Sequence, residues 1–147
     1  MNEANGRQTY YAYIGSYAAP EGPGIYACTY NENNGQLTVI DEISGLQDPT
    51  FLTVDDANQK LYAISSYFDE QGAKHGEARS FQIQSDGKLS FLNRQATVAP
   101  TCHITLDHSK RCLIVSSYHG GMVGVCPIKP DGKIGAISDV QQHEGSS

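Results

Sequence analysis

The chain has 147 residues and a net charge of −6, with 10 Lys and Arg residues against 16 Asp and Glu residues. Nucleic-acid binding depends on clustered Lys and Arg that neutralise phosphates, so this balance argues against a nucleic-acid partner. No stretch approaches the ~18 apolar residues of a membrane helix, and residues 1–8 lack the apolar core of a signal peptide. We therefore expect a cytoplasmic protein with neither nucleic acid nor a membrane as its partner.

Short strands are predicted along the whole chain, because aromatic, aliphatic and β-branched residues form short runs between segments rich in Gly, Pro and Asp. No run repeats apolar residues at i, i+3, i+4 and i+7, so no helix is predicted. The expected strands are Tyr10–Tyr17, Gly24–Tyr30, Leu37–Ile43, Phe51–Asp55, Leu61–Ser65, Arg79–Gln84, Leu89–Asn93, His103–Asp107, Cys112–Ser117 and Met122–Ile128. Tyr67–Ala78 is predicted to be the longest loop, either a functional loop or a mobile surface insertion.

Three similar turns separate these strands. Asn34-Gly35, Asp86-Gly87 and Asp131-Gly132 are each followed by a polar residue and then by Leu or Ile, and their glycines are 52 and 45 residues apart. Asn-Gly and Asp-Gly between strands are typical of hairpins with a type I′ turn, in which both central residues need positive φ. The three dipeptides therefore predict three hairpins in equivalent positions.

A weak internal duplication has the same spacing. The segment PTFLTVDDANQKLYAISS, which begins at Pro49, is echoed 52 positions later by TCHITLDHSKRCLIVSSY, which begins at Thr101. The identical pairs are Thr53 and Thr105, Asp55 and Asp107, Leu61 and Leu113, and Ser65 and Ser117. Four short strands repeated with a period near 50 residues are typical of the blades of a β-propeller.

The number of repeats limits what this chain can form. It holds about three units, whereas closed propellers have roughly 4–8 blades. The predicted fold class is therefore all-β, a partial β-propeller of about three four-stranded antiparallel sheets. We expect residues 1–147 to be the N-terminal blades of an incomplete domain, because 137–147 begins a further strand-like run and then stops. An open ring exposes apolar blade faces, so we expect missing C-terminal blades or self-association to cover them.

The four cysteines show no CxxC spacing and the histidines show no HxxxH spacing. The cysteines are Cys28, Cys102, Cys112 and Cys126. We expect reduced, mostly buried thiols rather than disulfides or a zinc site, and no metal or other cofactor is predicted. The one basic cluster, Lys110-Arg111, is interpreted as a solvated turn.

Several segments between about Tyr11 and Ser147 carry a family resemblance. They are YIGSY, GIY, NNGQLTVI, DPTFLTV, LYAISS, DGKLSFLNRQ, TCHITLDHSKRCLIVSSYHGGMVGV and DGKIGAISDVQQHEGSS. In these segments the chain resembles the N-terminal part of the lactonase family of seven-bladed propellers, the bacterial 6-phosphogluconolactonase type, which is similar in fold to the fungal carboxy-muconate cycloisomerases. The resemblance implies a hydrolase of 6-phosphoglucono-δ-lactone in the pentose phosphate pathway, with a small sugar lactone as its ligand.

The chain departs from the family's pattern at a few positions. These are Ser65 and Ser117, where Asn is typical, Thr101, where Pro is usual, Asn58 and Lys110, where Gly is usual, and Ser66. Ser66 matters most for chemistry, because the family commonly has an acidic residue there and this chain loses that carboxylate.

Lactone hydrolysis requires a general base beside the attacking water and donors for the developing oxyanion. His103 is the candidate catalytic residue, since alternation within CHITLD places it on the polar face of a strand whose other face carries Ile104. The resemblance implies that this strand lines the central channel. The competing interpretation is a structural histidine, bonded to the backbone carbonyl of a neighbouring blade.

Two further residues are candidates for substrate binding. His143, next to Glu144, could belong to a ligand loop near the channel mouth, although adjacent strand residues face opposite sides and a plain turn is the alternative. Arg94 follows a predicted strand and could meet an anion, or it could simply be solvated. The resemblance implies that the family's catalytic histidine, arginine and glutamate lie in later blades, so we expect this chain alone to be inactive.

Two other functions remain open at this point. One is a muconate-type lactonising cycloisomerase, which would need a cationic site for a carboxylated substrate without a phosphate clamp. The other is a non-enzymatic propeller that serves as a binding scaffold, which the loss of the carboxylate at Ser66 suggests. The fold alone cannot decide among these functions.

Overall fold

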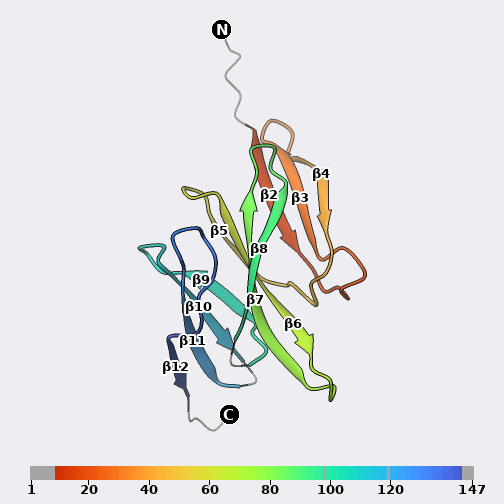
Figure 1. Ribbon diagram of the computed structural model, residues 1–147. Helices are drawn as coiled ribbons and strands as arrows, with labels where there is room; N and C mark the ends of the chain where they lie inside the picture. The colour runs from red at the N-terminus through yellow and green to blue at the C-terminus, as the bar shows by residue number, and fades with distance from the viewer. Residues whose placement is uncertain (1–8, 98, 119, 144–147) are drawn as a thin grey trace.

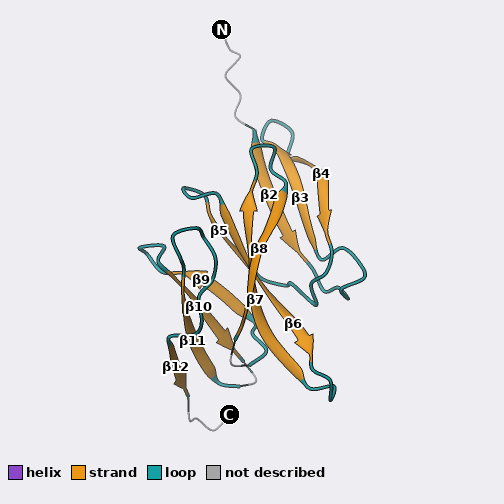
Figure 2. Cartoon of the chain, viewed as in Figure 1, coloured by secondary structure: helices purple, strands orange, loops and turns teal. Residues whose placement is uncertain are grey.

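The computed structural model describes residues 9–97, 99–118 and 120–143, and this part of the chain consists of strands, turns and loops (Figures 1 and 2). The strands are β2 (Tyr10–Gly15), β3 (Ile25–Asn31), β4 (Gln36–Ile43), β5 (Leu52–Asp55), β6 (Lys60–Phe68), β7 (Lys74–Ile83), β8 (Leu89–Ala96), β9 (His103–Leu106), β10 (Cys112–Ser117), β11 (Met122–Pro127) and β12 (Asp139–Gln142). No described residue is helical, so this part of the chain holds no helix that could cross a membrane. The predicted all-β class is confirmed.

The strands form three antiparallel sheets that follow one another along the chain. Their strand orders are β2-β3-β4, β5-β6-β7-β8 and β9-β10-β11-β12. The predicted partial propeller is confirmed, but the first sheet has three strands instead of four. The Asn34-Gly35 turn joins β3 to β4 as the Asp86-Gly87 turn joins β7 to β8. Strand β2 therefore corresponds to β6, and no strand of the described residues takes the place that β5 has in the second sheet.

The three Asx-Gly turns share one geometry. In each turn the Asx Oδ1 accepts a hydrogen bond from the backbone N–H two residues later, at 2.9 Å for Asn34 and 3.0 Å for Asp86 and Asp131. Only the glycines have positive φ, at 74°, 87° and 90°. The predicted type I′ turns are therefore wrong, because that type also needs positive φ at the Asx residue. The Asx side chain closes each turn through its local hydrogen bond instead.

Most of the predicted loop Tyr67–Ala78 is strand. Strand β6 continues to Phe68 and β7 begins at Lys74, so the turn covers only 69–73. Asp69 organises this turn, since its Oδ1 accepts hydrogen bonds from two backbone N–H groups of the turn, each at 2.9 Å. The prediction failed because these strand ends are polar, and cross-strand backbone pairing rather than an apolar pattern extends them.

The internal duplication corresponds to the hairpins β5–β6 and β9–β10. Leu61 and its repeat Leu113 are both fully buried, and Ser65 and Ser117 are at most 5% exposed. The residues that recur in the sequence therefore include those that lie between the sheets.

Two apolar clusters join the sheets face to face. Between the first and second sheets lie Ile25, Leu46, Leu61, Ala63, Phe81 and Ile83. Between the second and third sheets lie Tyr62, Ile64, Ala78, Ile104, Leu113, Val115, Cys126 and Ile134. Burial of each large apolar side chain contributes about 1.5–3 kcal/mol. This stacking stabilises sheets that could not bury both faces alone.

All four cysteines are unpaired thiols. Cys28 and Cys126 are buried and Cys112 is half-buried, whereas Cys102 is exposed. Burial raises the pKa of the Cys126 thiol to about 11, so this thiol stays protonated at neutral pH.

Candidate functional site

His103 is the first residue of β9, an edge strand of the third sheet that lies against β5, an edge strand of the second sheet. The next residue, Ile104, is fully buried in the cluster between these sheets and anchors the strand. The His103 side chain is exposed, and its ring packs against the ring of Phe51 with centroids 4.2 Å apart and planes inclined by 51°. The structure thus shows the alternation expected at the start of β9.

The imidazole of His103 has no hydrogen-bond partner among the described residues. A structural histidine bonded to a backbone carbonyl therefore finds no support in this part of the chain. A neutral imidazole offers one donor and one acceptor, and both stay available on the exposed side of Phe51. Such a group can take a proton from a bound water and return it to a leaving oxygen.

The two residues before His103 were not predicted as site groups. The backbone N–H of Cys102 donates to Ser116 O at 2.9 Å, which extends the pairing of β9 with β10. Thr101 Oγ1 is buried and has no hydrogen-bond partner among the residues that the structure describes. An unpaired buried hydroxyl costs about 1–3 kcal/mol and is uncommon. The sequence did not predict this buried hydroxyl, because Thr101 was identified only as a residue that replaces the family's usual proline.

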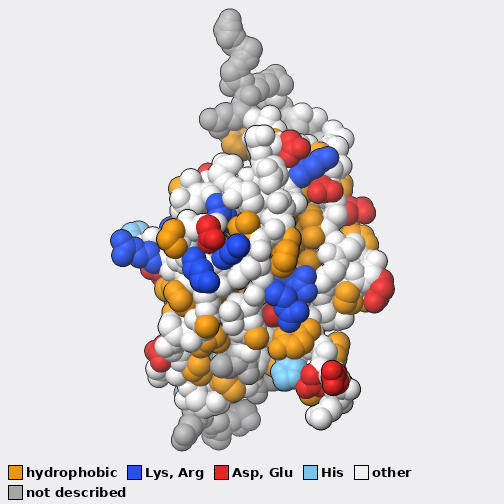
Figure 3. All heavy atoms as spheres, in the orientation of Figure 1, with side chains coloured by type: hydrophobic (Ala, Val, Ile, Leu, Met, Phe, Trp, Pro, Cys, Tyr) orange, Lys and Arg blue, Asp and Glu red, His pale blue; other side chains and the backbone are white. Residues whose placement is uncertain are grey.

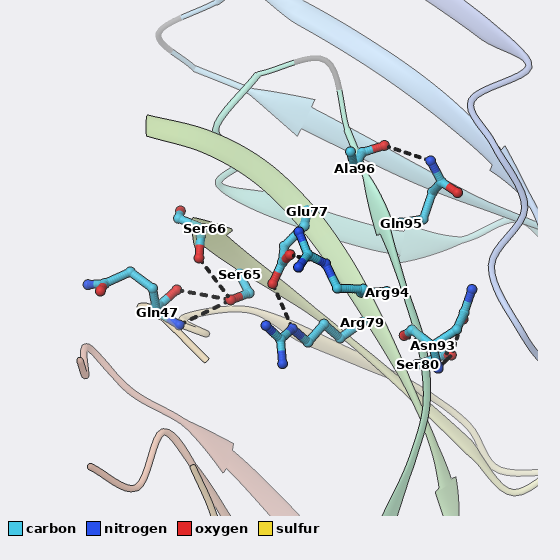
Figure 4. Close-up of polar contacts among 10 residues, drawn as sticks. All are labelled: Gln47, Ser65, Ser66, Glu77, Arg79, Ser80, Asn93, Arg94, Gln95 and Ala96. Carbon is cyan, nitrogen blue, oxygen red and sulfur yellow. Dashed lines mark hydrogen bonds and ion pairs between the residues drawn. The ribbon is translucent and has the colours of Figure 1, made fainter. Parts of the chain in front are cut away.

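Arg94 lies on β8, at the opposite edge of the second sheet from β5. Its Nε is 2.9 Å from Glu77 Oε1, an ion pair without hydrogen-bond geometry, and its guanidinium carbon is 4.8 Å from the centre of the Tyr67 ring. Figure 4 shows that Arg79 points toward the same carboxylate, to which its Nε donates a hydrogen bond of 2.6 Å. The structure thus places Arg94 in an ion-pair cluster of the second sheet and not beside His103.

Glu77 is the buried centre of this cluster, and sequence reasoning missed it because it fell inside the predicted loop. Glu77 is the cross-strand partner of Ser65 in the register of β6 and β7, whereas Ser66 is paired with Gly76. Arg79 and Arg94 stand directly opposite each other on β7 and β8. Like charges in that position repel, and the shared carboxylate offsets the repulsion.

His75 lies on β7, two residues before Glu77, although the sequence placed it in a loop. His75 Nε2 is 2.8 Å from Asp69 Oδ2, and its ring stacks on Tyr67 with centroids 5.1 Å apart. The hydrogen bond from His75 holds the pKa of Asp69 below its usual range. Because Tyr67 contacts both His75 and Arg94, the hairpin turn and the ion-pair cluster form one polar network.

His143 follows β12, at the opposite edge of the third sheet from His103. Its backbone N–H donates to Gly121 O at 2.7 Å, and its side chain is exposed. Strands are spaced about 4.8 Å apart, so about 14 Å separates the two edges of this four-stranded sheet. The structure therefore brings none of the candidates His103, Arg94 and His143 together. Glu144 lies outside the described residues.

Within residues 9–97, 99–118 and 120–143, no group of three or more His, Cys, Asp or Glu side chains is arranged to hold a metal ion. The candidate group at the start of β9 is the His103 imidazole, which can transfer a proton. Its neighbours are an apolar ring on one side and the backbone of β10 on the other.

Sequence comparison identifies relatives of this fold. The sequence model of a family described as "Lactonase, 7-bladed beta-propeller" matches residues 11–147. The 6-phosphogluconolactonase of Bacillus subtilis (strain 168) is 28% identical over 138 residues, which cover 92% of this chain and 38% of that protein.

Solved structures show the same arrangement of strands. A Bacteroides fragilis protein, provisionally assigned as a 6-phosphogluconolactonase, matches with a TM-score of 0.78 and 26% identity over 91% of this chain and 36% of its own. The periplasmic gluconolactonase PpgL of Pseudomonas aeruginosa matches in fold with a TM-score of 0.79 and 22% identity, over 92% of this chain and 39% of its own. The chain thus spans well under half the length of these relatives.

Proposed function

Because the chain belongs to the seven-bladed β-propeller lactonase family, we propose that it contributes to the hydrolysis of a sugar lactone, with 6-phosphoglucono-δ-lactone as the first substrate to test. That substrate would place the reaction in the pentose phosphate pathway. The observation that carries the proposal is His103, whose exposed imidazole has no hydrogen-bond partner among the described residues. In a closed ring, the edge strands β5 and β9 would border the central channel and turn this imidazole toward a ligand.

The proposed chemistry adds water to the lactone carbonyl carbon and breaks the bond between that carbon and the ring oxygen. His103 takes the proton from the attacking water and gives it to the ring oxygen as it leaves, so the protons balance. A positioned general base contributes about 10²–10⁴-fold to such a rate. Donors for the oxyanion are also required. We expect them in the part of the longer relatives that this chain does not span, so residues 1–147 alone should be inactive.

We also propose that His143 and Arg94 bind the substrate. His143 is exposed at the same end of the third sheet as His103, since Ser116 pairs with His103 and Met122 pairs with Gln142. It would therefore contact a part of the substrate that is remote from the lactone carbonyl. Arg94 directs Nε at Glu77, so its terminal N–H groups are those that it could offer to an anion.

The test is to express the complete reading frame and to follow acid release from 6-phosphoglucono-δ-lactone against the spontaneous rate. We expect acceleration by the complete protein and none by residues 1–147. Glucono-δ-lactone, which lacks the phosphate, serves as the matched substrate and shows whether the phosphate is recognised. Spontaneous rates with both lactones would contradict the proposed function.

We also propose that further blades or a second copy of the chain cover the outer sheets. Leu37 and Val39 on β4 are 45% and 52% exposed, and Val123 on β11 is 40% exposed. Apolar side chains on a sheet face are normally covered in a stable blade. Sedimentation of residues 1–147 should therefore show association or aggregation, and a compact monomer would contradict this proposal.

The cytoplasm is the location that we propose for the reaction. The four unpaired cysteines support it, since reduced thiols are typical of that compartment. Cell fractionation of the native source tests it, and recovery in an exported fraction would contradict it.

A further inference from the structure

A cationic pocket of about 400 Å³ lies between the second and third sheets. Its walls come from three turns: the β5–β6 turn, the β9–β10 turn, and the segment that follows β11. These turns stand at the end of β9 opposite to His103. Every lining residue belongs to the second or third sheet or to the loops that join their strands.

The pocket gathers positive charge on an acidic chain. Lys60, Lys110, Arg111 and Lys129 line it, and they are four of the 10 Lys and Arg residues in a chain of net charge −6. Figure 3 shows Lys and Arg side chains grouped at the left of the molecule, over the turns that join β5 to β6 and β9 to β10 in Figure 1. Lys110 and Arg111 are exposed in the β9–β10 turn, as the sequence predicted, and the structure adds that Lys60 and Lys129, which are distant in the chain, line the same pocket.

One carboxylate, Asp55, is present in the lining, and it neutralises little of this charge. Asp55 is 2% exposed, and its Oδ2 accepts a hydrogen bond of 2.8 Å from Asn58. Lys110 Nζ approaches its Oδ1 at 3.9 Å. Among the described residues, Arg111 and Lys129 have no ion pair. The lining therefore has four cationic side chains against one carboxylate, while Asp56, Asp107 and Asp131 lie in the same three turns outside the lining.

Lys60, Tyr62 and Gly132 contact one another on one side of the pocket. Gly132 has φ of 90°, and a Cβ placed on it would lie 2.2 Å from Lys60 Cε, so the absence of a side chain leaves room for the Lys60 stem. Lys60 Nζ donates to Asn58 O at 3.0 Å. Below them the buried Tyr62 hydroxyl donates to Gly132 O at 3.1 Å. These contacts fix one cation and the glycine turn beside it.

We propose that this pocket binds a phosphorylated small molecule through Lys60, Lys110, Arg111 and Lys129. Lys and Arg donors recognise phosphate oxygens through charge-assisted hydrogen bonds. A volume of about 400 Å³ lies within the range of small-molecule sites, which is about 300–1,000 Å³. A nucleic acid would need a longer basic track than this compact cluster on an acidic chain. The inference rests on this pocket alone and does not depend on lactonase activity.

The test is isothermal titration with inorganic phosphate and with pyrophosphate at low and at physiological ionic strength. We expect saturable binding, and the double variant Arg111→Gln/Lys129→Gln should weaken it by about tenfold or more. The single variant Arg111→Gln should also weaken binding, and its matched control is Lys88→Gln, because each removes one positive charge and Lys88 is exposed in the β7–β8 turn. Lys88→Gln should bind as the unmodified protein does. Gly132→Ala should also weaken binding, since it displaces Lys60.

The thermal stability of each variant distinguishes loss of the pocket from loss of the fold. An unchanged thermal unfolding midpoint shows that a variant is folded, so a loss of binding then belongs to the pocket. Absence of saturable binding, or an equal loss in Lys88→Gln, overturns the proposal. Tighter binding of a single-stranded oligonucleotide that depends on Arg111 and Lys129 would assign the cluster to nucleic acid instead.

Discussion

Phe51 and His103 occupy equivalent positions of the internal duplication, 52 residues apart, and their rings pack against each other with centroids 4.2 Å apart. The contact exists because β5, which follows Phe51, and β9, which begins at His103, lie side by side. One copy of the repeat thus supplies an apolar ring and the next supplies a titratable one. Phe51 restricts the orientation of the imidazole while leaving its nitrogens unbonded within the described residues.

Replacing His103 by Ala in the complete protein should lower kcat/KM for lactone hydrolysis by about 10²–10⁴-fold, because the proposed general base is lost. His103→Gln should be similarly impaired, since an amide has comparable size but cannot accept the proton. Steady-state kinetics corrected for spontaneous hydrolysis measures both.

His108→Ala is the matched control, because His108 is exposed in the turn at the other end of β9. It should retain the full rate. An unaltered rate in His103→Ala would remove this residue from the reaction and leave Phe51 and His103 as a packing pair.

Replacing Glu77 by Gln should lower the free energy of unfolding by about 2–3 kcal/mol. The substitution leaves Arg79, which is 19% exposed, opposite Arg94 without their shared counter-charge. The effect should fall below the ~3–5 kcal/mol of a fully buried pair, because Arg94 is 49% exposed. Urea unfolding of the variant measures it.

The two arginines provide an internal comparison for this prediction. Arg79→Met should cost more stability than Arg94→Met, because Arg79 is less exposed and donates a hydrogen bond to Glu77. If Glu77→Gln were as stable as the unmodified protein, the cluster would contribute no net stability.

The sequence predicted those features that neighbouring residues determine. Alternation placed Ile104 inside and His103 outside, and the Asx-Gly dipeptides marked three turns correctly, although the turn type depended on a side-chain hydrogen bond that the dipeptide rule ignores. The extent of β6 and β7 was missed because pairing across the hairpin, not local apolarity, orders their polar ends.

Contacts between distant segments were beyond sequence reasoning. Glu77 is paired by Arg79 in its own strand and by Arg94 in the next, and the cations of the pocket come from turns up to 69 residues apart. A single sequence gives no signal for such convergence. It could name His103 as a candidate, but only the fold shows that its ring meets Phe51.

Gly76→Ala should destabilise the protein by about 2 kcal/mol or more. A Cβ at Gly76 would lie 2.1 Å from Ala99 O and 2.6 Å from Thr97 Oγ1, and backbone cannot move aside cheaply. Gly72→Ala is the control: its φ is 84°, but nothing lies within 4 Å of an added Cβ, so it should cost only about 1 kcal/mol. Equal unfolding midpoints for both variants would show that Thr97 and Ala99 are not held against β7.

Alkaline pH should destabilise the fold through Cys126 and Tyr62. Burial raises the pKa of the Cys126 thiol from 9.0 to about 11 and that of the Tyr62 hydroxyl from 10.0 to about 12. Both groups are neutral when protonated, and the folded chain keeps these protons to a higher pH than the unfolded chain does. Their contribution is therefore fully present below about pH 9 and falls as the pH rises through about 11 for the thiol and about 12 for the phenol.

The measurement is the free energy of unfolding in urea between pH 7 and about pH 10.5, where the thiol should dominate the fall. Cys126→Val removes the thiol from a fully buried position and should flatten the curve above about pH 9. An identical slope in Cys126→Val would mean that the Cys126 thiol reaches water before the protein unfolds, and that the cluster between the second and third sheets opens locally.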